Sequence, residues 1–354
     1  MLSTLQQKIV DNDENVIFVE AAAASGKTAT IVEKIKKELQ ANKGKVVAFT
    51  FTNAAADEMY ERVGSYDASK LFIGTIHSYC VQLLLSHGID KAIDYCEEQW
   101  FDKLFNLVKK NPECVKPVYC IICDEMQDCN ANQFEFIFDI LSATKYFCCY
   151  DKRQSIYRWN GAHPEFIDDY IEQLNAEVLT LNENYRNANK ILTFAKNIIN
   201  CAGWDYRDES IPMRNITGSV LADVEYSPAA VAKTLSEYGG NWNDWFILTR
   251  TNDQIDEICH YLDRFSVPYD TFKRAELNNK ELNERMKANT VKVLTIHSAK
   301  GLEANNVIVI GSRFYNLEER CISYVAATRA RNRLIWTRVP NKARKYNKVS
   351  NWES

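Results

Sequence analysis

The sequence lacks an excess of positive charge. Its 354 residues include 43 Lys and Arg against 47 Asp and Glu, which gives a formal net charge of −4 and a pI of about 5.9. This balance excludes a basic field over the whole surface, which would attract nucleic acid without a dedicated site. A nucleic-acid site in this chain must be local, made of aromatic side chains and a few cations.

The sequence also lacks long apolar runs. None approaches the ~20 residues of a membrane-spanning helix, so we expect no membrane partner. The first fifteen residues, MLSTLQQKIVDNDEN, have neither the basic start nor the apolar core of a signal peptide. These absences predict a cytoplasmic protein.

Paired cysteine spacing is nearly missing as well. Eleven cysteines lie mostly in apolar stretches. Cys120 and Cys123 form a CxxC, but only Ile-Ile separates them on a predicted strand. We therefore favour buried thiols in a reducing compartment and expect neither structural zinc nor disulfides.

The sequence does contain a strong candidate for a phosphate-binding loop, NVIFVEAAAASGKT, from Asn15 to Thr28. An apolar strand pattern ends at small residues, and a helical pattern follows. Loop N–H groups and a helix N-terminus bind phosphate, a Lys adds charge, and a Thr hydroxyl can hold Mg²⁺. An ordinary strand–helix turn is the alternative, because 21–24 are all Ala. The predicted cofactor-binding residues are Ala22, Ala23, Ala24, Ser25, Gly26, Lys27 and Thr28.

A pair of carboxylates follows the apolar segment YCIIC. Ligands of open α/β sheets bind at the carboxyl ends of the strands. We predict that Asp124 and Thr28 hold Mg²⁺ and that Glu125 deprotonates the attacking water. A solvated acidic turn is the alternative.

Strand and helix patterns alternate along the chain, which predicts α/β architecture with parallel sheets covered on both faces. Expected elements include a strand over 45–51 and helices over 53–63, 134–141 and 323–330. A second αβ set begins near Leu181, and we detect no sequence repeat between the two sets. The basic tail, 342–348, is expected to be solvated, with a DNA contact as the alternative.

Nine motifs in order resemble those of the UvrD/Rep/PcrA-type superfamily-one helicases, over nearly the whole chain. They are LSTLQ, AAAASGKT, FTFTNAAADEM, GTIHSYC, DEMQD, DKRQSIYRWNGA, LNENYRNANKIL, VLTIHSAKGLE and YVAATRAR. The resemblance implies two RecA-like P-loop NTPase domains, 1–181 and 182–354, with ATP in the cleft between them. A small helical insertion is expected at 88–118.

The resemblance also implies roles in binding ATP. Gln6 would read adenine, Tyr185 would stack on it, and Glu303 would accept a hydrogen bond from the ribose. Lys27 would contact the β- and γ-phosphates.

Further residues are implied in catalysis. Gln154 would couple the γ-phosphate to the DNA groove. Arg186 and Arg329 would act as arginine fingers on the transferring phosphoryl group. A surface salt bridge is the alternative for a lone Arg.

The expected DNA groove combines stacking and phosphate contacts. Phe51, Tyr157 and Trp159 resemble base-stacking residues, at ~1–3 kcal/mol per base; for Phe51 alone, a core position is an equal alternative. The residues expected to bind phosphates or sugars are Thr52, Asn53, Thr75, His77, Thr295 and His297.

The chain departs from the family at several positions. Ala22 and Ala24 replace glycines, which costs little unless φ is positive or the backbone must touch phosphate. Ala54 and Asn160 replace cations near the groove, so DNA affinity is expected to be modest. Only 272–289 stands where relatives carry a second inserted subdomain, which predicts a minimal motor.

We therefore expect an ATP- and Mg²⁺-dependent motor that translocates on single-stranded DNA and unwinds duplex, 3′→5′ by resemblance, in a bacterial or phage-infected cell. Expected partners are single-stranded DNA, duplex junctions, and replication or repair proteins of unknown identity. Two alternatives are a DNA-stimulated ATPase that remodels protein–DNA complexes without processive unwinding, and a nucleotide-switched DNA-binding module.

Overall fold

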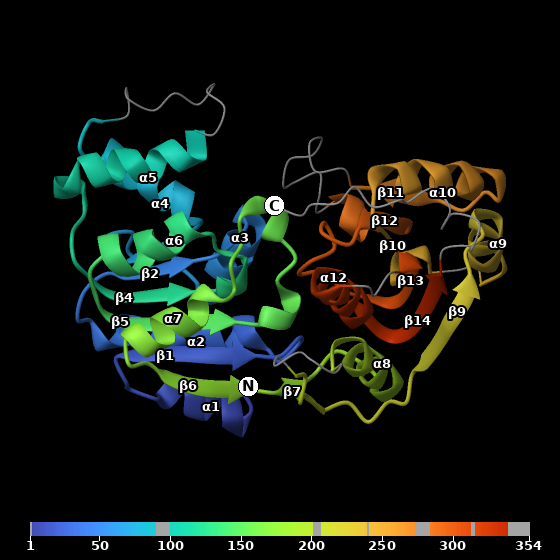
Figure 1. Cartoon of the computed structure of the whole chain (residues 1–354), viewed down its shortest axis with the longest axis horizontal. Helices are drawn as coiled ribbons and strands as arrows, with labels where there is room; N and C mark the ends of the chain where they lie inside the picture. Colours follow the sequence, from blue (N-terminus) through green and yellow to red (C-terminus); the bar gives the residue numbers. More distant parts are fainter. Residues whose placement is uncertain are drawn as a thin grey trace. The chain divides into compact units, whose positions relative to one another are not determined.

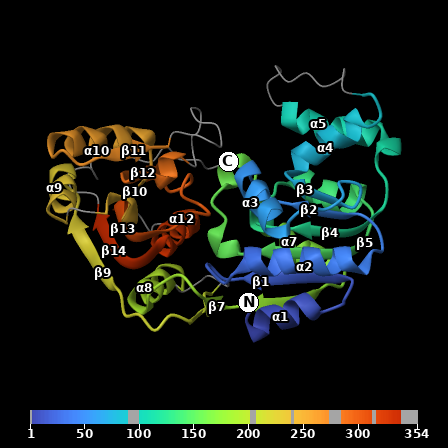
Figure 2. The same ribbon diagram turned by 180° about the vertical axis from the view of Figure 1, so that it is seen from behind.

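The computed structural model describes residues 2–89, 100–200, 207–238, 241–272, 284–312 and 316–338. The chain divides into two compact units, Met1–Glu183 and Asn184–Ser354, two residues beyond the predicted boundary. Each unit contains a six-stranded parallel sheet with helices against it, as Figures 1 and 2 show. Within the described ranges, no helix is long and apolar enough to cross a membrane.

The first unit is built on a sheet with strand order β3-β2-β4-β5-β1-β6, in which neighbouring strands run parallel. Its strands are β1 Val16–Ala21, β2 Val46–Phe49, β3 Leu71–Gly74, β4 Val118–Cys123, β5 Ala143–Tyr150 and β6 Glu177–Leu181. Its helices are α1 Thr4–Asp11, α2 Lys27–Ala41, α3 Asn53–Val63, α4 Ile76–Leu85, α5 Trp100–Lys110, α6 Ala131–Glu135 and α7 Phe166–Gln173.

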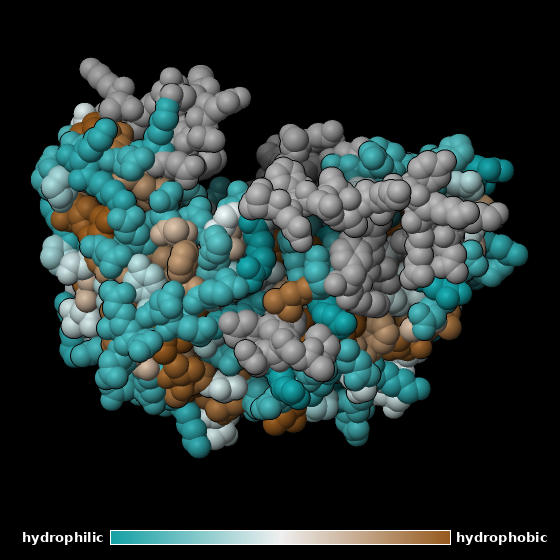
Figure 3. All heavy atoms as spheres, in the orientation of Figure 1, coloured by the Kyte–Doolittle hydropathy of each residue, from teal (hydrophilic) through white to brown (hydrophobic). Residues whose placement is uncertain are grey.

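Both faces of this sheet are buried, which explains the continuous apolar strands of the sequence. On β4, Ile121 and Cys123 pack toward α4, α6 and α7, whereas Cys120 and Ile122 pack toward α1, α2 and α3. The alternation follows from the two-residue period of a strand. On the face of the molecule in Figure 3, apolar side chains gather only in small groups among hydrophilic ones.

The second unit has a sheet of order β11-β12-β10-β13-β14-β9, also with parallel neighbours. Its strands are β9 Ser219–Glu225, β10 Trp245–Thr249, β11 Tyr269–Thr271, β12 Val291–Thr295, β13 Ala304–Ser312 and β14 Ala330–Arg338. Its helices are α8 Asn189–Ile199, α9 Pro228–Tyr238, α10 Asn252–Arg264 and α12 Leu317–Thr328. A short ribbon pairs β7 Glu183–Asn184 with β8 Ile211–Pro212.

The two sheets share an order that the sequence did not reveal. β3-β2-β4-β5-β1 of the first unit matches β12-β10-β13-β14-β9 of the second, position by position. The turns at the ends of matching strands also match. TFTN follows β2, and TRTN begins at the last residue of β10. TIHS follows β3, and a second TIHS begins at the last residue of β12. The repeat is therefore real but confined to short turns.

Several boundaries differ from the sequence-based expectation for local reasons. The expected strand over 45–51 ends at Phe49, because Thr50 begins the turn. The helix expected over 134–141 begins at Ala131, where Asn130 caps it, and continues as a π-helix, Phe136–Ile140. Helix α12 begins six residues before the expected 323, because the Asn316 side chain accepts from the Glu319 N–H.

Part of the expected insertion at 88–118 is described. It contains α5 and a short 3₁₀ turn, Pro112–Cys114. Residues 90–99 lie outside the described residues, as do 273–283 and the basic tail at 342–348.

Candidate nucleotide and nucleic-acid sites

The phosphate loop connects β1 to α2, and one hydrogen bond to β6 and one within the loop hold it. The Ala22 N–H donates to the Leu181 carbonyl at 2.9 Å, and the Ser25 N–H donates to the Ala22 carbonyl at 3.2 Å. Gly26 precedes α2 with φ 79°, in the left-handed region that favours glycine. The positive φ therefore favours glycine here, and a Cβ on Gly26, 2.3 Å from Gln6 Nε2, would also displace the end of the Gln6 side chain.

Gln6 lies directly over this loop. Its Nε2 donates to the Ser25 carbonyl at 2.9 Å, and its Oε1 accepts from the Ser3 N–H at 2.8 Å within a capping box. The side chain is buried, so Gln6 joins the start of α1 to the phosphate loop. Its expected contact with adenine stays a prediction.

Ala24 has the positive φ at which an alanine in place of a glycine is costly. Its φ is 60°, whereas Ala22 is not among the residues with positive φ in the described chain. A left-handed conformation costs a residue with a Cβ about 1–2 kcal/mol. The loss of glycine is therefore costly at Ala24 and not at Ala22.

The variant Ala24→Gly is expected to raise the free energy of unfolding by about 1 kcal/mol, because glycine adopts this φ without strain. Ala22→Gly is the matched control and is expected to lower it by about 0.4–1 kcal/mol, because glycine only adds freedom to the unfolded chain. Urea denaturation of both variants measures the difference. A loss of stability in both would show that the Ala24 methyl contributes more by packing than its φ costs.

The predicted site residues of the first unit come together around Lys27, the first residue of α2. Its ammonium lies 3.0 Å from Asp124 Oδ1 and donates to Glu125 Oε1. The side chains of Lys27 and Asp124 are only 12% and 9% exposed. Burial favours neutral Lys27, but the two carboxylates outweigh it and raise the pKa of Lys27 above its ordinary value. The site is thus a charged cluster in which a lysine balances two carboxylates.

Asp124 is the carboxylate that this environment perturbs. Burial raises the pKa of Asp124, Lys27 opposes that rise, and the neighbouring Glu125 adds to it. Removing the cation from this place would therefore favour protonation of Asp124.

The donor set fits the predicted magnesium ion. Asp124 and Thr28 offer hard oxygen atoms, and the ammonium 3.0 Å from Asp124 shows that this carboxylate accepts a cation. Among the described residues, no group of three or more His, Cys, Asp or Glu side chains could hold a metal. A bound Mg²⁺ would therefore complete its shell with phosphate oxygens and water.

Glu125 is held from two sides in an unusual backbone conformation. Its φ and ψ are 55° and 42°, which places a non-glycine residue in the left-handed region. Lys27 binds Oε1, and the Gln127 side-chain amide donates to Oε2. Such conformations persist where the surroundings over-determine them, often at functional sites.

A buried polar chain continues from Glu125 to the residues after β5. Gln127 is fully buried, and its Oε1 accepts from the Asp151 N–H at 2.9 Å. Asp151 in turn accepts from Arg153 Nε at 2.6 Å and from Gln154 Nε2 at 2.7 Å. Hydrogen bonds through Gln127 and Asp151 thus connect Glu125 to Gln154.

Gln127 and Asp151 were not among the predicted site residues. Each follows one of two adjacent strands, β4 and β5. Polar residues after neighbouring parallel strands are the signal that could have identified them.

The expected stacking residues form one aromatic group with unequal exposure. The Phe51 and Tyr157 rings stack at 4.9 Å, and Tyr157 lies 6.2 Å from Trp159. Trp159 is 65% exposed, Phe51 is half-buried and Tyr157 is buried. Trp159 is therefore the best placed to meet a base, while a direct contact from Tyr157 would require its ring to become accessible.

The TxTN turns have the same internal hydrogen bonds in both units. The hydroxyl of Thr50 donates to the Thr52 carbonyl at 2.9 Å, and that of Thr249 donates to the Thr251 carbonyl at 3.0 Å. Thr52 and Thr251 cap α3 and α10, and each is exposed together with the Asn that follows it. Asn53 is thus the first residue of α3, and its counterpart Asn252, the first residue of α10, was not predicted from the sequence.

The TIHS turns repeat in the same way. The Ser78 N–H donates to Thr75 Oγ1 at 3.1 Å, and the Ser298 N–H donates to Thr295 Oγ1 at 3.2 Å. Each turn contains a histidine. The ring of His77 lies 5.2 Å from that of Phe105, and His297 is half-buried. DNA contacts by these residues stay predictions.

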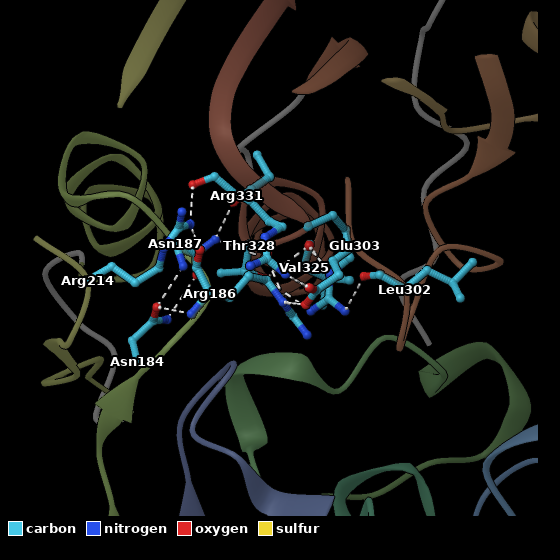
Figure 4. Close-up of polar contacts among 11 residues, drawn as sticks. Asn184, Arg186, Asn187, Arg214, Leu302, Glu303, Val325, Thr328 and Arg331 are labelled. Atoms are coloured by element: carbon cyan, nitrogen blue, oxygen red, sulfur yellow. Dashed lines mark hydrogen bonds and ion pairs between the residues drawn. The ribbon is translucent and has the colours of Figure 1, made fainter. Parts of the chain in front are cut away.

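In the second unit, Glu303 lies between two arginines, as Figure 4 shows. Arg186 Nε donates to Oε2 and Arg331 donates to Oε1. Burial favours neutral Glu303, but the two guanidinium groups outweigh it and hold its pKa below the ordinary value. Tyr185, the expected adenine partner, is 39% exposed.

Arg329 has a different environment. Its side chain is 2% exposed and donates to the carbonyls of Val325 at 3.0 Å and Leu302 at 3.3 Å. In this structure Arg329 therefore stabilises the end of α12, and its expected action on a phosphoryl group stays a prediction.

Comparisons with known proteins give the same assignment for both units. The UvrD/REP helicase N-terminal domain matches residues 2–113 and 101–175, and the UvrD-like helicase C-terminal domain matches 270–340.

Individual relatives are similar at low identity. DNA helicase II of Haemophilus influenzae is 23% identical over 71% of this chain and 48% of its own length. The helicase PcrA of Bacillus subtilis is 25% identical over 72% of this chain and 48% of its own length. The chain therefore spans about half the length of these two relatives. The Gabija protein GajB of Bacillus cereus is 26% identical over 93% of this chain and 94% of its own length. With both family domains in order on two parallel-sheet units, the chain belongs to the UvrD-like DNA helicases, of the UvrD/Rep/PcrA type.

Proposed function

We propose that this protein is an ATP-dependent motor that translocates on single-stranded DNA and unwinds duplex DNA in the 3′→5′ direction. The observation that carries the proposal is the Lys27 cluster with Asp124 and Glu125, and its buried connection to Gln154. It supports a site that hydrolyses ATP and passes the event on to Gln154, which lies five residues before Trp159 in the chain.

Hydrolysis begins with an exchange of partners at Lys27. The ammonium leaves the carboxylates for the more concentrated charge of the β- and γ-phosphates. Glu125, no longer neutralised, accepts a proton from the water that attacks the γ-phosphorus, while Gln127 holds the second oxygen of Glu125. The bond from the γ-phosphorus to the β,γ-bridging oxygen breaks, and ADP leaves. Bound Mg²⁺, held by Thr28 and Asp124, would supply electrostatic stabilisation of the phosphates.

DNA contacts are proposed at the repeated turns and at Trp159. The exposed Thr-Asn pairs at the starts of α3 and α10 offer backbone N–H groups and amides to phosphates. This proposal adds Thr251 and Asn252 to the predicted set, on the basis of the matching hydrogen bonds. Trp159 supplies a stacking surface that accepts any base.

Steady-state ATPase with and without single-stranded DNA tests the proposal. DNA is expected to stimulate hydrolysis severalfold in the wild type, and Lys27→Ala should abolish hydrolysis. Trp159→Ala should keep basal ATPase while raising the DNA concentration for half-maximal stimulation about 5- to 150-fold, from ~1–3 kcal/mol per stacked base. Loss of basal ATPase in Trp159→Ala would instead indicate a structural Trp.

Strand separation on duplexes with a 3′ or a 5′ tail then distinguishes the candidate activities. Unwinding of the 3′-tailed duplex alone supports the motor with the proposed polarity. DNA-stimulated ATPase without unwinding would leave the remodelling ATPase. Nucleotide binding without hydrolysis would leave the switched binding module.

A further inference from the structure

A second arginine on Glu303, Arg331, has no role in the proposed function. Glu303 directly precedes β13 and Arg331 is the second residue of β14. These strands are neighbours, with Ala304 paired to Ala330, so Glu303 lies one residue before this pair and Arg331 one residue after it, within reach of each other's long side chains. The contact is therefore built into the sheet.

The two arginines hold different oxygens of one carboxylate. Arg186 takes Oε2, and its NH1 also donates to the Thr328 carbonyl at 3.3 Å. Arg331 takes Oε1. A carboxylate offers about four lone-pair sites, and the Glu303 side chain is 34% exposed, so it retains acceptor capacity toward solvent.

Arg331 is itself fixed by its backbone. Its carbonyl accepts from the Ala188 N–H at 2.8 Å and from Arg214 NH1 at 3.1 Å. Arg331 therefore anchors Glu303 from the sheet, whereas Arg186 belongs to the segment before α8. If Arg186 turns to a nucleotide phosphate, Arg331 still holds the carboxylate.

We propose that Arg331 is a positioning residue that keeps Glu303 oriented to accept a ribose hydroxyl of the bound nucleotide, independently of Arg186. The inference rests on the proposed function, since it assumes that Glu303 faces a nucleotide. The low pKa of Glu303 is consistent with it, because an ionised carboxylate accepts a hydroxyl hydrogen bond more strongly.

The test compares ATP with 2′,3′-dideoxy-ATP, which lacks both ribose hydroxyls, in the wild type and in Arg331→Met. Equilibrium dissociation constants are measured by titration, so the readout does not depend on hydrolysis. For ATP, Arg331→Met is expected to weaken binding about 5- to 20-fold, because a misoriented Glu303 loses part of one hydrogen bond to a charged group. For the dideoxy nucleotide, the change is expected to stay within about twofold, since the ribose contact is already gone.

Arg333→Met is the matched control. Arg333 lies two residues further along β14, with its guanidinium 4.6 Å from the Tyr238 ring. This variant should bind both nucleotides as the wild type does. Arg331→Lys, which keeps the charge without the guanidinium geometry, should recover part of the affinity for ATP.

The outcomes separate the inference from the proposed function. An equal loss for both nucleotides in Arg331→Met overturns the positioning role, as does a wild type that binds both equally well. Where binding follows the expected pattern, kcat at saturating ATP should change less than about twofold in Arg331→Met. The lost ribose contact is equally strong in the ground state and in the transition state, so its loss raises KM alone. Loss of affinity for ATP alone in Arg331→Met, in a protein that never hydrolyses ATP, overturns the motor and still supports Arg331 as a positioning residue.

Discussion

Replacing Glu125 by Gln is expected to lower ATP hydrolysis about 10²- to 10⁴-fold, the usual contribution of a general base. The amide keeps the size of the side chain and one acceptor oxygen but cannot take a proton from water. Binding of ATP should remain, because Lys27 then faces one carboxylate, Asp124, instead of two and is more available to phosphates. Single-turnover hydrolysis and nucleotide titration together measure both effects.

The neighbours of Glu125 make this substitution informative. Lys27 and Gln127 both donate to its carboxylate, so a Gln side chain can still accept from one of them with its carbonyl oxygen. Gln carries the same Cβ as Glu, so the substitution adds no strain to the left-handed backbone at this position. A fold defect is therefore not the expected cause of lost activity.

Glu33→Gln is a suitable control. Glu33 pairs with Lys36 on α2, and its side chain is 44% exposed. Its substitution removes a carboxylate near the phosphate loop in sequence and should leave hydrolysis within about twofold, as exposed ion pairs contribute little. Normal hydrolysis by Glu125→Gln would exclude Glu125 as the base.

The parts of the site that directly follow a strand in the sequence were predictable from short-range patterns. The apolar strands end at Ala21 and Cys123, and the phosphate loop and Asp124 follow them directly. Strand β6 was missed, because it is an edge strand whose residues Glu177 and Val178 are exposed and show no buried pattern.

Partners that meet only in the folded chain could not be predicted. Gln127 reaches Asp151 because β4 and β5 are neighbours, and Glu303 meets Arg331 because β13 and β14 are. The repeated turns were likewise missed, since their alignment depends on strand order rather than on continuous similarity. The motif that contains Tyr157 does not indicate whether its ring is buried or exposed, and in the structure the ring is buried.

Lys34→Ala is expected to destabilise the first unit by about 3–5 kcal/mol. The importance of Lys34 for stability was not apparent from the sequence. Its side chain on α2 is 2% exposed, and its ammonium lies 3.1 Å from Glu38 Oε1, which is equally buried. It also donates to the carbonyls of Asn12 at 2.7 Å and Val10 at 3.3 Å. Alanine would leave a buried carboxylate and two carbonyls without these donors.

Urea denaturation checks this prediction against two further variants. Lys36→Ala, on the same helix but 30% exposed, should cost less than about 1 kcal/mol. The double variant Lys34→Met, Glu38→Gln removes both charges while keeping most of the volume, and should recover much of the stability lost in Lys34→Ala. A small loss for Lys34→Ala would show that water or Lys145, 3.8 Å from Glu38, compensates for the missing ammonium.

The same variant should also weaken the nucleotide site. Lys34 and Lys37 bind the carbonyls at the end of α1, and the other end of α1 places Gln6 over the phosphate loop. Loosening α1 therefore frees the Ser25 carbonyl from its donor and removes the contact that favours the present loop conformation. We expect Lys34→Ala to bind ATP more weakly even at temperatures where the chain remains folded. Unchanged affinity would show that the contact of Gln6 with Ser25 does not depend on the lysines at the far end of α1.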